Sequence, residues 1–110
     1  MADEKILTNA QEDESSTLVK FSKAYHFEGK DYTEVDLSGM DDLSAEDMIA
    51  ADRYLTRSGS FSVMPEMTLE YACFIAARAA KQPIEFFRGL PPKDALKVKN
   101  RVTSFFYSED

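Results

Sequence analysis

The amino-acid sequence predicts an α+β fold that is mostly α, in which an N-terminal β-hairpin packs on a bundle of three to four helices. Apolar residues alternate with polar ones over residues 17–37, the period of a half-buried strand. From residue 44 onward they recur at helical spacing instead. The length of 110 residues fits one domain with its own core, so we expect a single domain over residues 17–107.

Residues 1–16 are expected to form a disordered acidic tail. They carry five acidic side chains against one lysine and show no apolar period. A segment with so little to bury cannot offset the entropy lost on ordering. The tail contributes most of the formal charge of −7, which makes nucleic acid and anionic membranes poor partners. No apolar run approaches the ~18 residues of a membrane span, and the N-terminus has no signal-peptide pattern.

The hairpin is expected over residues 17–37, with its turn at Gly29. A two-residue loop of Glu28 and Gly29 would set Phe21 opposite Asp36. A three-residue loop ending at Gly29 would set Phe21 opposite Val35 and keep the apolar side chains on one face. The sequence therefore favours the three-residue loop, with Gly29 at a position of positive φ.

Helix start and stop signals follow the hairpin. Ser44 with an acidic residue three positions later is typical of a helix N-terminus, as is Thr68, and Pro83 and Gly89 bracket a short helix. The second helix is apolar nearly all round, which indicates burial by its neighbours. The last helix has one apolar face, which includes Val98 and Val102. We expect helices at about residues 44–58, 68–81, 83–88 and 92–107.

The sequence contains no pattern of catalytic or metal-binding residues. It lacks a glycine-rich phosphate loop, paired Cys or His spacing, and a nucleophile elbow. We expect His26 on an exposed strand face and Cys73 buried in the most apolar helix. The pair Asp41 and Asp42 lacks the spaced ligands of a calcium loop. We therefore predict a protein that is not an enzyme and has no cofactor and no metal.

Neighbouring aromatic residues near the C-terminus are the candidate binding site. Phe86 and Phe87 diverge by about 100° around a helix, as do Phe105 and Phe106. We expect the core to take one ring of each pair and leave the other near solvent. Phe87, Leu90 and Phe106 are therefore predicted to form a partner-binding patch. Basic residues of the last helix are expected on a solvated face, where they could also receive an acidic partner or the protein's own acidic tail; they are Lys93, Lys97, Lys99 and Arg101.

The order of these elements resembles the small tail assembly chaperones of tailed bacteriophages, with counterparts in Mu-like and P2-like phages. The matching segments are a hairpin, an acidic loop, a first helix, and a run of helices that ends in two phenylalanines. They are residues 27–30 (FEGK), 32–37 (YTEVDL), 41–42 (DD), 43–52, 76–83, 86–90 and the Asp94-centred helix that ends at Phe105 and Phe106. The resemblance covers residues 18–107.

This resemblance implies a protein of the bacterial host cytoplasm that binds the tape-measure protein and recruits tail-tube subunits. It also implies a tendency to self-associate. Other readings remain open: a small acidic binding module, such as a phage regulator, an antitoxin-like inhibitor or a DNA mimic, or a structural head–tail connector. The position of the gene separates these, because a chaperone gene should lie between the tube and tape-measure genes.

Overall fold

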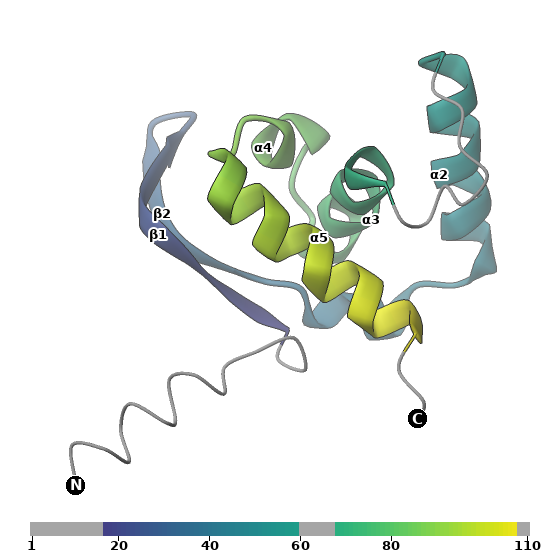
Figure 1. Ribbon diagram of the computed structural model, residues 1–110, viewed down its shortest axis with the longest axis horizontal. Helices are drawn as coiled ribbons and strands as arrows, with labels where there is room; N and C mark the ends of the chain where they lie inside the picture. Colours follow the sequence, from purple (N-terminus) through teal and green to yellow (C-terminus); the bar gives the residue numbers. More distant parts are fainter. Residues whose placement is uncertain (1–16, 60–67, 108–110) are drawn as a thin grey trace, which may run out of the picture.

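The computed structural model describes residues 17–59 and 68–107 (Figure 1). Its hairpin consists of β1 (Leu18–Phe27) and β2 (Lys30–Asp36). The helical elements that follow are the 3-10 helix η1 (Ser38–Asp42) and the α-helices α2 (Ala45–Arg57), α3 (Leu69–Ala80), α4 (Ile84–Arg88) and α5 (Pro92–Tyr107). The predicted fold class is confirmed, and the four α-helices match their expected ranges to within one residue at each end. The expected tail, residues 1–16, lies outside the described residues.

The hairpin turn differs from the prediction. Phe27 pairs with Lys30, so the loop consists of the two residues Glu28 and Gly29, with φ of 49° and 83°. Positive φ at both positions is typical of a type I′ turn, which matches the twist of the flanking strands. The positive φ of Gly29 is confirmed, and the three-residue loop is wrong.

The expected apolar face is preserved by an irregularity farther along the ladder. Tyr25 pairs with Tyr32 and Lys20 with Glu34, so residues 21–24 of β1 face a single residue of β2. This insertion shifts the register by an odd number, which the prediction of an uninterrupted ladder did not allow for. Val19 consequently lies opposite Val35, in the position where the prediction had placed Phe21. Both valines are buried.

The predicted helix signals are confirmed by their hydrogen bonds. At the start of α2, the Ser44 hydroxyl accepts from the amide of Glu46, and the Asp47 carboxylate accepts from the amide of Ser44. The Thr68 hydroxyl accepts from the amide of Tyr71 at the start of α3. Such caps satisfy amides that have no partner within the helix. The acidic loop expected at residues 41–42 is the last part of η1, Ser38–Asp42.

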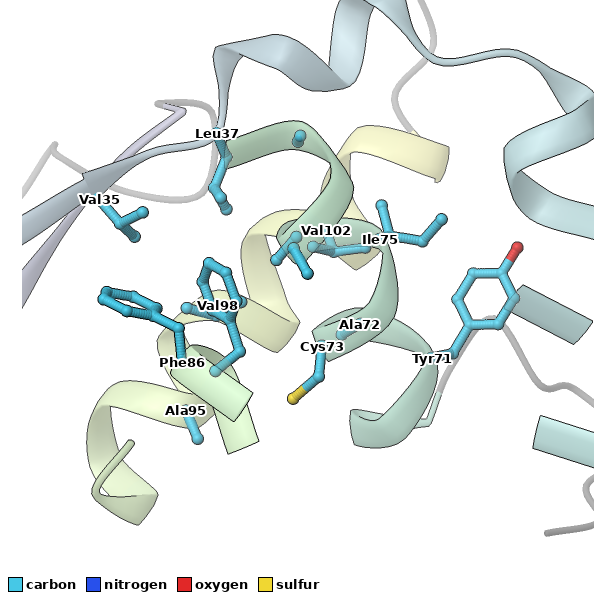
Figure 2. Packing of buried hydrophobic residues seen from close by; sticks show 14 of the residues in the cluster. Val35, Leu37, Tyr71, Ala72, Cys73, Ile75, Phe86, Ala95, Val98 and Val102 are labelled. Carbon is cyan, nitrogen blue, oxygen red and sulfur yellow. The ribbon is translucent and has the colours of Figure 1, made fainter. Parts of the chain in front are cut away.

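Helix α3 lies at the centre of the core and packs against η1, α2, α4 and α5 (Figure 2). Its small buried residues allow these neighbours to approach closely; they are Ala72, Cys73, Ala76, Ala77 and Ala79. Helix η1 approaches the end of α3 closely at Gly39, where a Cβ atom would overlap the carbonyl oxygen of Ala79. Only glycine therefore fits against the end of α3.

An aromatic cluster fixes the hairpin against α4. The Phe86 ring is fully buried, and four half-buried rings of the hairpin surround it at centroid distances of 4.9–6.4 Å; they belong to Phe21, Tyr25, Phe27 and Tyr32. Most of these contacts are edge-to-face, the arrangement that aromatic quadrupoles favour. The Tyr25 hydroxyl also donates to the carbonyl of Phe86 at 2.8 Å.

Candidate protein-binding surfaces

Two residues of the predicted binding patch are buried. Phe87 is 1% exposed and Leu90 is 7% exposed, so the expectation that they lie at the surface is wrong. The reason is that α4 is a single five-residue helix with the hairpin rings around Phe86 and with α3 packed against it. Both neighbouring rings therefore have a core environment.

Phe106 is half-buried near the C-terminal end of α5. Its ring packs edge-to-face on Tyr71, at a centroid distance of 6.0 Å, and on Phe105, at 5.7 Å. The structure thus places Phe106 on the rim of the core, apart in the chain from the buried pair on and after α4. The three predicted residues do not form one exposed patch.

Other large apolar side chains are more exposed than any of these. They are Met48, Ile49, Leu69, Leu96 and Tyr107. Met48 and Ile49 are consecutive on α2, with exposed fractions of 37% and 49%. In the sequence, Met48, Ala51 and Leu55 recur at helical spacing and would form one apolar stripe, but only Ala51 and Leu55 are buried on α2. Ile49 lies off that stripe in the sequence pattern, and this was the signal for an exposed apolar residue.

A hollow of about 390 Å³ lies beside these side chains, between α2 and α3. Ile49 and Arg53 line it together with the start of α2 and Arg78 of α3. Inside it, Arg78 Nε donates to Asp47 Oδ1 at 2.6 Å. The Ser44 amide and this guanidinium hold the pKa of the Asp47 carboxyl below its usual value of 3.8. The Asp47–Arg78 ion pair therefore links α2 to α3, and Ile49 lines the same hollow with an exposed apolar side chain.

The polar side of α5 binds the backbone of β1. Asp94 is fully buried and accepts from both the amide and the hydroxyl of Ser22, at 2.9 and 3.1 Å. Lys97 Nζ donates to the carbonyl of Lys20 at 2.8 Å, and Arg101 Nη1 donates to the carbonyl of Leu18 at 3.0 Å. Two of the four basic residues that the sequence placed on a solvated face thus bind the hairpin, and this part of the prediction is wrong.

The two residues with the greatest catalytic potential lie where the sequence predicted. His26 is exposed and lies 2.8 Å from Asp31. Cys73 is buried, and burial raises the pKa of its thiol from 9.0 to about 11. Within residues 17–59 and 68–107, no three His, Cys, Asp or Glu side chains are grouped as a metal ion would need. Over the same ranges, no helix is both long and apolar enough to cross a membrane.

Comparison of the chain with protein-family models, with curated proteins and with solved structures gave no match.

Proposed function

We propose that this protein is a tail assembly chaperone of a tailed bacteriophage, which acts by binding the tape-measure protein and recruiting tail-tube subunits in the cytoplasm of the bacterial host. The order of hairpin, acidic η1 and four described helices agrees with the resemblance found in the sequence. The observation that carries a binding role is the pair Met48 and Ile49, two consecutive apolar side chains that α2 presents to solvent.

A chaperone of this kind needs apolar surface that it can share reversibly. Burial of one such side chain at an interface contributes roughly 1.5–3 kcal/mol, which is enough to dominate a weak contact. The net charge of −7 keeps a protein with exposed apolar groups soluble and supports the same role. In this proposal α2 meets an apolar stretch of the tape-measure protein.

The test is co-expression with a tape-measure protein encoded in the same genome, followed by pull-down. We expect the wild-type protein to keep the tape-measure protein soluble and to be captured with it. The double variant Met48→Ser with Ile49→Ser should weaken capture by about tenfold or more, because two apolar contacts are lost. Leu96→Ser is the matched control, since Leu96 is equally exposed but lies on α5.

The outcomes separate the function from the surface. If the wild-type protein neither captures nor solubilises the tape-measure protein, the proposed function is wrong. If the double variant folds by circular dichroism and binds like wild type, the function stands and α2 is not the binding surface.

A further inference from the structure

One face of α2 carries two opposite charges on either side of an apolar centre. Glu46, Ile49, Ala50 and Arg53 follow one another at positions i, i+3, i+4 and i+7, which places them on one side of a helix. The structure agrees, because all four line the same hollow beside Arg78. Glu46 and Arg53 are exposed, and Ile49 is 49% exposed. Helix α2 lies at one edge of the molecule, so this face is open to a partner (Figure 1).

The two charges have no partner among the described residues. Asp47 and Arg78 neutralise each other in the hollow. The Glu46 carboxylate and the Arg53 guanidinium, in contrast, form no ion pair with another described residue. Seven residues of helix separate them by roughly 10 Å along the axis, too far for contact with each other. The pair is therefore available to opposite charges at the same spacing on a partner.

We propose that α2 pairs with α2 of a second copy of this chain, antiparallel, with the two-fold axis between Ile49 and Ala50. Glu46 of each copy then faces Arg53 of the other, because positions 46 and 53 lie equally far from the axis. Ile49 and Ala50 meet their counterparts at the centre, where the small alanine allows close approach of the helices. The charges and the apolar residues of this face thus complement themselves.

Other arrangements of the two helices lose this match. A parallel pair sets Glu46 against Glu46 and Arg53 against Arg53. An antiparallel pair that slides by two turns keeps the same face but also sets one of these like-charge contacts. A slide by one turn sets Arg53 against Ala50 or Glu46 against Ile49, a charged residue against an apolar one. Like charges cost free energy at an interface, so the charge pattern selects the antiparallel register centred on Ile49 and Ala50.

The pairing is weak and reversible, because one face of a 13-residue helix buries far less than the roughly 800 Å² that each partner contributes to a standard interface. It covers Ile49, which is also part of the surface proposed for the tape-measure protein. The two contacts therefore compete for α2, and this competition rests on the proposed function. The pairing itself is measured on this chain alone, so it and tape-measure binding can fail separately.

The first test measures the mass of the full chain by sedimentation equilibrium over a range of concentrations. Glu46→Arg alone and Arg53→Glu alone should each raise the dissociation constant by about tenfold, because each sets like charges against one another at both symmetry-related positions. A mixture of the two variants should associate as tightly as wild type, since every arginine then faces a glutamate. Asp52→Arg is the control: it changes the net charge as Glu46→Arg does, at an exposed position of α2 outside the hollow, and should change the dissociation constant less than about twofold.

The second test is a cross-link. Helices packed 8–10 Å apart bring the Cα atoms of residues beside the two-fold axis to roughly 5–7 Å, which overlaps the range of a disulfide. Ala50→Cys should therefore form a covalent dimer under mild oxidation, while the native Cys73 is buried. Thr56→Cys is the control on the same helix: it is exposed, but its counterpart lies about 20 Å away along the axis. It should cross-link at least about tenfold more slowly.

Glu46→Arg places a cation in the first turn of α2, where the helix dipole disfavours it. If that variant unfolds, Arg53→Glu alone and the cross-link still decide. A wild-type chain that stays monomeric at millimolar concentration, folded variants that do not associate when mixed, or equal cross-linking of the two cysteine variants would each overturn the proposal.

Discussion

Helices α3 and α2 pack against each other but are held in different ways. Helix α3 buries seven of its twelve residues, including Ile75 and Ala76 without any exposed surface. Helix α2 is one residue longer but buries only Ala51 and Leu55. Helix α2 also contacts the rest of the molecule through polar and aromatic side chains. These contacts are the Asp47–Arg78 ion pair, the Tyr54–Phe74 ring contact, and a hydrogen bond from Arg88 to the Tyr54 hydroxyl.

This difference indicates that stability is unevenly distributed over the molecule. Buried apolar area carries most of the free energy of folding, whereas exposed ion pairs contribute little. Elements with few buried contacts open locally at lower free energy than the core does. Helix α2 thus detaches at a lower cost in free energy than α3 does, and it also presents the exposed apolar pair.

The largest effect on the free energy of unfolding is expected in the core, at Phe86. Phe86→Ala removes the ring at the centre of the aromatic cluster and should cost about 3–5 kcal/mol of unfolding free energy, measured in urea. Leu96→Ala is the control, since half of Leu96 is already exposed, and should change the midpoint little. A loss at Phe86 no larger than at Leu96 would contradict the packing described.

Ala76 tests how tightly α3 is enclosed. Ala76→Leu should cost ~1–3 kcal/mol because the added carbons have no space between α3 and its neighbours. Ala45→Leu makes the same change at an exposed position of α2 and should be nearly neutral. An unchanged unfolding midpoint for Ala76→Leu would place Ala76 outside the core.

Asp47 tests the attachment of α2. Asp47→Asn weakens the helix cap and the pair with Arg78 and should cost about 1 kcal/mol near pH 7. The fold lowers the pKa of Asp47, so its stabilisation is present above the usual value of 3.8 and is lost as the pH falls through the folded-state pKa. Wild type and variant should converge in stability below that pH. A difference that stays constant down to pH 2 would show that the charge of Asp47 contributes nothing.

The rate at which Cys73 reacts with a thiol reagent compares α3 with α2 and barely perturbs the protein. Raising the thiol pKa from 9.0 to about 11 lowers its thiolate fraction roughly a hundredfold near pH 8. A thiol reagent should therefore label native Cys73 at least that much more slowly than a cysteine introduced by Asp52→Cys on the exposed side of α2. Equal labelling rates would mean that α3 opens as readily as α2.

Local signals predicted the elements of this fold because the physics that sets them is local. The hydroxyls of Ser44 and Thr68 cap the helices that follow them, and the apolar period of α5 buries Val98 and Val102. A helix cap needs only residues three positions apart, and an apolar face needs only its own period. These features are therefore legible without the tertiary structure.

The errors concern contacts between distant parts of the chain. The amide of Ser22 binds Asp94, 72 residues away, in the same stretch of β1 where the ladder loses its regular register. Five residues of α4 are too few to define a buried face, so the sequence could not tell that both Phe86 and Phe87 would be enclosed. The exposed apolar residues of α2 were missed because Met48 fits the helical period, although no neighbour covers it fully.

The contact between η1 and α3 has a consequence for the evolution of this sequence. A Cβ atom at position 39 would meet three backbone atoms of Ala79, and backbone cannot swing aside as a side chain does. Every substitution there must push apart the segment that joins the hairpin to α2 and the end of the central helix. In a library of all single substitutions, position 39 should accept glycine alone, whereas Gly29, with open space around its Cβ, should accept asparagine.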